Sequence, residues 1–226
     1  MATGYSGTSG SSQVAISSDG LTWKTGGFPF TTTSFGNSSY YGNGYWVVGG
    51  NSGSATNSTM YSTNVSIAGN SSITWTTVGT TNNPAYSVIF NGSFWVIGTN
   101  NYFLYRSANT LPNSGYTSIP SGYPQFVGPL GYNGNNIVFG GSSSSITIYN
   151  IPNINNTTII GNATISNLLR PWQFDYNTTN SVFVLAGDTG VNTNSFSYST
   201  NNGVSWTNNT VVSTKIYKCV GVAFAR

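Results

Sequence analysis

The side chains that could do acid–base chemistry are few in this chain. Its 226 residues include three acidic side chains, Asp19, Asp175 and Asp188, and neither Glu nor His. Glycoside hydrolysis ordinarily needs two carboxylates about 5–9.5 Å apart. Asp175 and Asp188 belong to one short repeat, but two solvated aspartates beside turns are the commoner arrangement. We therefore expect no enzymatic activity, no metal site and no cofactor.

The basic residues are too few and too scattered for a nucleic-acid surface. The net charge is +3, and the six basic side chains are Lys24, Arg106, Arg170, Lys215, Lys218 and Arg226. A protein that makes about 6–10 phosphate contacts needs about that many cations on one face. We expect no nucleic acid among the partners of this protein.

The single thiol and the apolar runs exclude further classes. Cys219 has no second cysteine to pair with and no histidine to activate it, so we expect a buried thiol. No apolar run approaches the 18 residues of a membrane span, and the first residues lack a charged, then apolar, signal pattern. We expect no membrane partner, and a virion or a host cytoplasm are the compartments we consider.

Short apolar runs recur along the chain at a nearly constant spacing. The runs Trp46–Gly49, Trp95–Gly98, Ile137–Gly140 and Phe183–Ala186 are each followed by a Tyr-containing segment. These four segments start at positions 61, 105, 149 and 198, and residues 16–19 supply a fifth copy at the start of the chain. The five positions are 45, 44, 44 and 49 residues apart. From position 198 through the C-terminus back to position 16 the distance is again 44 residues.

Each repeat reads as four short strands. The second strand is apolar on both faces, which is typical of a strand that lies between two neighbouring sheets. Asn43-Gly44, Asn91-Gly92 and Asn133-Gly134 precede it and predict tight hairpins with positive φ at both turn residues. Four-strand units at a period of 40–50 residues indicate a β-propeller.

The spacing predicts an all-β, five-bladed β-propeller that forms a single domain of residues 1–226. The predicted blades are residues 1–33 plus 215–226, 34–81, 82–122, 123–165 and 166–214. In the first of these, residues 217–224 match a first strand and residues 1–4 a second strand. The N- and C-terminal strands would therefore close one shared blade.

Two segments carry a turn motif. Residues 199–206 read S-T-N-N-G-V-S-W, and residues 17–23 read S-S-D-G-L-T-W. Asp19 and Asn201 can accept backbone N–H bonds, Gly20 and Gly203 can take positive φ, and Trp23 and Trp206 can pack beneath the turn. We expect these six residues to be structural.

The motif resembles the Asp-box (BNR) motif S-x-D-x-G-x-T-W of sialidase and sortilin-type propellers. The whole chain is similar to tandem W-V-x-x-G … Y-S-x-D-G-x-T-W repeat proteins of giant viruses and phages. For a sialidase, the resemblance implies a catalytic set of three Arg, a Tyr–Glu pair and an Asp. The chain has three Arg, at 106, 170 and 226, but no Glu. The resemblance therefore agrees with a structural turn rather than with catalysis.

Composition favours a binding module as the function. Asn, Ser, Thr and Gly make up 121 of the 226 residues, and 15% are aromatic. Neutral amides and hydroxyls with aromatic rings suit sugar hydroxyls and sugar faces. We expect lectin-like recognition of glycans or of a host surface by a monomer, with Arg170, Trp172, Tyr176 and Asp188 as candidate contacts. The alternative is a structural or decoration protein of a virus particle that has no small-molecule ligand.

Overall fold

A computed structural model describes twelve stretches of the chain. These are residues 1–3, 14–27, 35–51, 58–63, 73–78, 83–99, 104–119, 129–140, 145–152, 161–166, 170–188 and 196–208. The chain divides into two compact units, Met1–Ile119 and Pro120–Arg226, and each is described by itself. All regular elements of the described residues are β-strands.

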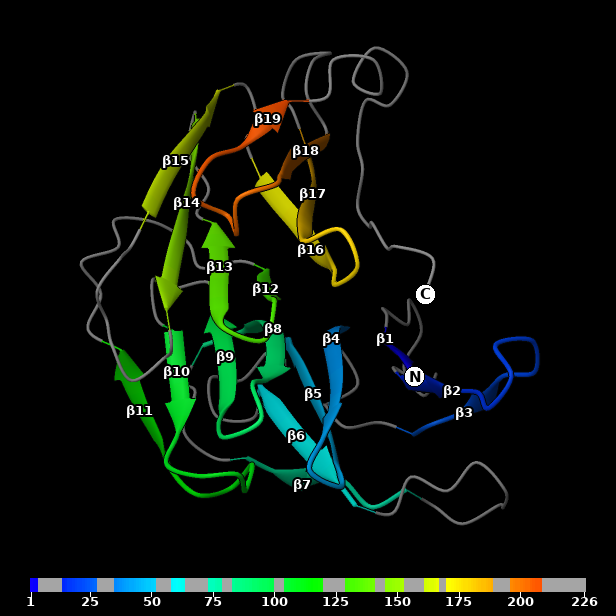
Figure 1. The fold of residues 1–226 in the computed structure, drawn as a ribbon. Helices are drawn as coiled ribbons and strands as arrows, with labels where there is room; N and C mark the ends of the chain where they lie inside the picture. The colour runs from blue at the N-terminus through cyan, green and yellow to red at the C-terminus, as the bar shows by residue number, and fades with distance from the viewer. Residues whose placement is uncertain are drawn as a thin grey trace. The chain divides into compact units, whose positions relative to one another are not determined.

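The first unit contains three antiparallel sheets (Figure 1). One has three strands: β1 Ala2–Thr3, β2 Val14–Ile16 and β3 Lys24–Thr25. The second has four: β4 Phe35–Gly42, β5 Tyr45–Asn51, β6 Thr59–Ser62 and β7 Thr76–Thr77. The third also has four: β8 Ala85–Phe90, β9 Trp95–Thr99, β10 Leu104–Ser107 and β11 Tyr116–Ile119.

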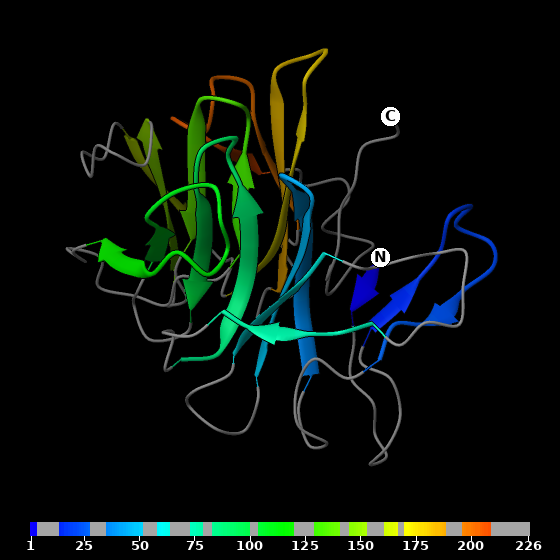
Figure 2. The same cartoon turned by 90° about the horizontal axis from the view of Figure 1, so that it is seen from below.

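The second unit contains two antiparallel sheets of four strands (Figures 1 and 2). The first is β12 Leu130–Tyr132, β13 Asn136–Gly140, β14 Ser145–Pro152 and β15 Gly161–Ser166. The second is β16 Arg170–Asn177, β17 Val182–Asp188, β18 Phe196–Ser199 and β19 Thr207–Asn208. In all four four-stranded sheets the strands follow chain order, as expected for up-and-down sheets whose hairpins are short.

The second strand of each four-stranded sheet is buried along consecutive residues. Every residue of β9 is buried, and β5, β13 and β17 show runs of four, four and five buried residues. In a strand with one solvent-exposed face, buried and exposed residues would alternate instead. The prediction that these strands are covered on both faces is therefore confirmed.

Each hydrophobic core lies between neighbouring sheets of one unit. In the first unit, β4 packs beside β8, and the cluster there consists of Val47, Val78, Ala85, Val88, Trp95 and Ile97. In the second unit, β12 packs beside β16, and the cluster consists of Val138, Ile165, Phe174, Phe183 and Leu185. A further cluster, Val14, Ile16, Val48 and Met60, joins the three-stranded sheet to β5 and β6.

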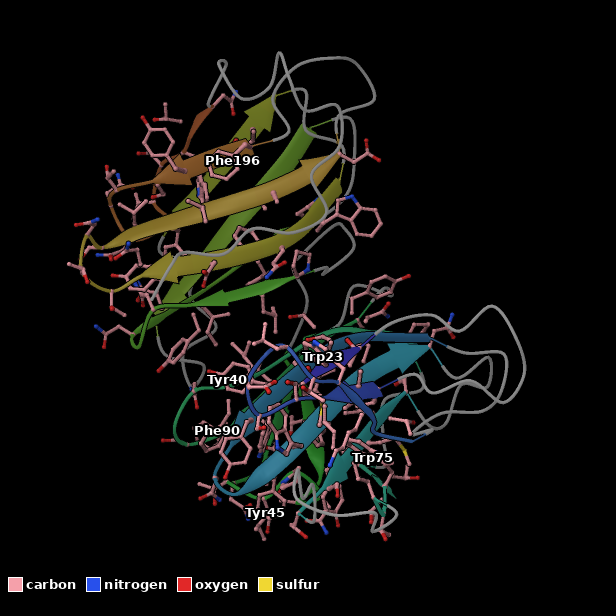
Figure 3. All side chains as sticks on the ribbon, turned by 90° about the vertical axis from the view of Figure 1, so that its right-hand side faces the viewer. Trp23, Tyr40, Tyr45, Trp75, Phe90 and Phe196 are labelled. Carbon is pink, nitrogen blue, oxygen red and sulfur yellow. The ribbon has the colours of Figure 1, made fainter. Side chains whose placement is uncertain are left out.

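Ring pairs recur across the first hairpin of three sheets. Tyr41 and Trp46 lie opposite each other with ring centroids 5.1 Å apart. The corresponding distances are 4.9 Å for Phe90 and Trp95 and 4.6 Å for Tyr176 and Phe183. Figure 3 labels Tyr40 and Phe90, both of which contact Trp95. Such cross-strand pairs stabilise the hairpin and help to fix its register.

The Asn-Gly turns are of two kinds, and the prediction for two of them is wrong. At Asn43-Gly44 both residues have positive φ, 48° and 80°, as predicted. At Asn91-Gly92 and Asn133-Gly134 only the glycine does. Their loops contain four residues, so the asparagine Oδ1 accepts two backbone N–H groups of its own loop, at 2.7–3.0 Å. The longer loop removes the need for a second left-handed residue.

The chain forms an all-β fold with several four-stranded antiparallel sheets. The predicted closing strand, residues 217–224, lies outside the described residues, as does Cys219. The blade number and the single domain remain predictions.

Candidate functional site

Three of the four candidate contact residues lie at one end of the β16–β17 hairpin. Arg170 begins β16 and Asp188 ends β17, and their Cα atoms are register partners in the ladder. Two of the nine charged residues of the chain thus occupy partnered backbone positions on one strand pair. Asp188 is partly exposed.

Trp172 lies beside this pair at a β-bulge. Pro171 is opposite Gly187 and Gln173 is opposite Ala186, so the register steps over Trp172. A bulge bends its strand and re-aims a side chain, and bulges are common next to binding sites. The Trp172 side chain is 36% exposed, one of the large apolar side chains that remain open to solvent. We call the backbone positions of Arg170, Trp172 and Asp188 the bulge end of β16–β17.

Tyr176, the fourth candidate contact, lies apart from these three residues. It lies four residues beyond Trp172 on the same strand, about 13 Å away at about 3.3 Å per residue. Its ring packs against Phe183 and the cluster of the second unit. Tyr176 is partly buried and lies one residue before the end of β16.

The two carboxylates considered for hydrolysis are also separated. Asp175 is opposite Val184, and Asp188 lies four residues beyond Val184, again about 13 Å along the strand. The Asp175 Oδ1 instead accepts the Tyr176 N–H at 2.9 Å.

The turn at Asp19 is held by the carboxylate. The N–H groups of Leu21 and Thr22 both donate to Asp19 Oδ1 at 2.8 Å, and the Ser17 hydroxyl donates to the same oxygen at 2.9 Å. These bonds, that of Thr22 first, lower the pKa of Asp19 from 3.8 to about 2. Gly20 takes φ 73°.

The turn at Asn201 uses the same bonding scheme with an amide. The Ser205 N–H donates to Asn201 Oδ1 at 2.9 Å, and the Ser199 hydroxyl donates to it at 2.9 Å. The amide has one bond that a carboxylate cannot make, from Nδ2 to Ser205 Oγ at 2.8 Å. Gly203 has φ 83°, and its N–H donates to Ser199 Oγ at 2.9 Å.

The two motif tryptophans differ in burial. Each donates its Nε1–H to the glycine carbonyl of its own turn at 3.1 Å, Trp23 to Gly20 and Trp206 to Gly203. Trp206 packs against Phe174 and Phe183, whereas Trp23 is 49% exposed. The expectation of a packed Trp23 is therefore wrong. Phe174, which packs against Trp206, lies in β16, the first strand of its sheet. The sheet of Trp23 has three described strands, and none of them corresponds to that first strand.

One turn of this kind was missed in the sequence. Asn109 Oδ1 accepts the Leu111 N–H at 2.8 Å, and Trp95 Nε1–H donates to the Thr110 carbonyl at 3.0 Å. The segment has neither the glycine nor the tryptophan of the motif at the expected positions. Its place after the Tyr105 segment and its S-A-N sequence at residues 107–109, which matches S-T-N at residues 199–201, could have indicated it.

Among the described residues, no three His, Cys, Asp or Glu side chains are close enough to share a metal ion. A helix with the length and apolar character of a membrane span is likewise absent from the part of the chain that the structure describes.

Comparison with known proteins identifies the fold and no family. No family model matches the chain, and no curated protein matches its sequence. Among solved structures, "YCF48 bound to D1 peptide" matches with a TM-score of 0.55 and 12% identity over 84% of this chain and 57% of that one. "Crystal Structure of Mitotic Checkpoint Complex" matches with a TM-score of 0.52 and 15% identity over 72% of this chain and 47% of that one.

Both matches are to β-propeller structures, so the chain has a fold of the β-propeller type. It spans about half the length of the solved structures that it matches. At this identity the likeness concerns the fold alone.

Proposed function

We propose that this protein is a non-enzymatic binding module that recognises glycans through the bulge end of β16–β17. The observation that carries the proposal is an exposed tryptophan, Trp172, at a β-bulge beside the register pair Arg170–Asp188. A β-propeller fold is compatible with a binding role.

The chemistry of the three residues suits a sugar. An exposed indole offers a flat apolar face to the C–H side of a pyranose ring, and burial of an aromatic side chain contributes much of the affinity at binding surfaces. A carboxylate accepts and a guanidinium donates hydrogen bonds, and hydrogen bonds to charged groups contribute about 1.5–3 kcal/mol each. The bulge fixes the backbone that presents the indole, which lowers the ordering cost of binding.

A glycan array tests the proposal. The wild-type chain should bind a defined set of glycans, and Trp172→Ala and Asp188→Asn should each lose binding at least tenfold. Tyr41→Ala is the matched control, because Tyr41 is 56% exposed on a different sheet and should leave glycan binding unchanged. Silence of the folded wild-type chain across the array, or full binding by Trp172→Ala, would overturn the proposal.

We also propose the finer fold of five blades. The support is the closing 44-residue period, together with one sheet of three described strands where the other four have four. Cysteines introduced together at Ala2 and Ala223, in a Cys219→Ser background, should then form an intrachain disulfide on oxidation. With Phe224 opposite Met1, as Phe90 is opposite Trp95, these two positions become strand partners within about 7 Å. If this variant does not cross-link, the closure is wrong.

The Asp-box resemblance remains part of this proposal. The bonding schemes at Asp19 and Asn201 support it, since both residues use one side-chain oxygen to hold the turn. Such turns are structural and carry no ligand in the proposed function.

A further inference from the structure

The bulge that presents Trp172 is repeated in the first strand of another sheet. In β8, Ala85 is opposite Thr99 and Ser87 is opposite Gly98, so the register steps over Tyr86. The bulges coincide in register, because Gly98 occupies in β9 the place that Ala186 occupies in β17. Tyr86 and Trp172 are therefore equivalent aromatic positions, one in each unit.

The bulge at Tyr86 is fixed by the neighbouring sheet. The Asn37 Nδ2–H donates to the Ala85 carbonyl at 2.9 Å, directly before the bulge. After the bulge, the Val88 N–H donates to Ser38 Oγ at 3.2 Å. Two side chains of β4 thus satisfy backbone groups around a point where the ladder is interrupted. Hydrogen bonds on both sides of the bulge therefore fix the backbone position of Tyr86.

A third bulge, in β4, serves a different purpose. There the register steps over Asn37, between Gly36 and Ser38. Its amide is engaged with Ala85, and it has no ring to offer. The aromatic positions of the described bulges are therefore Tyr86 and Trp172.

We infer that Tyr86 forms a second saccharide subsite, at the bulge position that corresponds to that of Trp172, so that the chain binds two glycan units. This inference rests on the proposed function. Tyr86 is partly exposed, and Asn83, partly exposed as well, precedes it by three residues. Arg170, which is opposite Asp188, lies two residues before Trp172. The residue two before Tyr86 is Pro84, which is uncharged. This subsite therefore presents uncharged groups and takes a neutral pyranose.

Calorimetry with single sugars tests the inference. The probes are the methyl glycosides of mannose, galactose, fucose and N-acetylglucosamine, each titrated separately into the full chain. The wild type should bind two molecules of one glycoside. Tyr86→Ala and Trp172→Ala should each bind one, and the double variant none. Tyr41→Ala should still bind two.

The outcomes separate this inference from the proposed function. One bound glycoside that is lost in Trp172→Ala and kept in Tyr86→Ala would overturn the second subsite and leave the proposed function standing. No binding of any glycoside, with a silent glycan array, would overturn both. Tyr86→Leu, which keeps the bulk and removes the aromatic ring, should lose the same site by at least tenfold; unchanged binding in a folded Tyr86→Leu would overturn the inference.

Discussion

At the scale of the residue, one oxygen holds each motif turn, whether its group is charged or neutral. Asp19 Oδ1 and Asn201 Oδ1 each accept a backbone N–H from the far side of the turn and a serine hydroxyl from the near side. The charge of Asp19 therefore affects how stability depends on pH, through the pKa of Asp19, and does not affect the shape of the turn.

Asp19→Asn should leave the turn formed and remove an acid-sensitive part of the stability. The folded pKa of about 2 lies below the usual 3.8, so the contribution of Asp19 is complete above about pH 4 and is lost as the pH falls towards about 2. Urea unfolding of both proteins between pH 2 and 6 should show a smaller acid loss in the variant. Equal acid losses would contradict this.

The sequence predicted these residues because their bonds are local. The motif spans eight residues or fewer, and the side chains that make the turn lie within it. The burial of Trp23 depends on neighbouring strands, so the sequence was wrong about it. The bulges that expose Trp172 and Tyr86 depend on which residues pair across two strands, which no local pattern encodes.

At the scale of the element, Gly49 in β5 sets how closely two sheets approach. A Cβ at Gly49 would lie 2.9 Å from Val88 Cγ2 and 3.1 Å from Ala85 Cβ. At the equivalent register position of β17 stands Ala186, fully buried. The spacing between sheets is therefore tighter beside β5 than a side chain would allow.

Gly49→Ala should destabilise the protein by about 1–3 kcal/mol, because the new methyl group overpacks the cluster between β5 and β8. The reverse exchange, Ala186→Gly, is the control and should cost about 1 kcal/mol, through chain entropy instead. Denaturant titrations give both values. A cost below about 0.5 kcal/mol for Gly49→Ala would show that β5 and β8 can separate.

The strands themselves were predictable from the sequence. Apolar runs such as Trp95–Gly98 are buried on both faces, and the runs recur at one spacing. The turn type at Asn91-Gly92 was not predictable from the sequence, because it depends on a loop length that the dipeptide does not specify.

At the scale of the whole molecule, almost nothing titrates near neutral pH. The chain has no His and no Glu, and its three carboxyl groups are aspartates. Folded and unfolded chains should therefore bind nearly equal numbers of protons between about pH 5 and 8. With nine charged residues in 226, screening by salt also has little to act on.

The melting temperature should accordingly move by no more than a few degrees between pH 5 and 8, and by as little between 0.05 and 0.5 M salt. Differential scanning calorimetry across both series measures this. A shift of about 5 °C or more in either series would reveal a buried titrating group or a dense ion-pair network that the composition does not predict.

The interchange of acid and amide in the motif turns gives an engineer a handle on solubility. Asn109 and Asn201 already occupy the place that a carboxylate fills at residue 19, so aspartate at either can accept the same backbone N–H bond; at residue 201 it gives up the Nδ2 bond to Ser205. The two exchanges together would bring the formal charge of the molecule from +3 to +1. Its electrophoretic mobility and its retention on an ion exchanger can thus be set almost independently of its architecture.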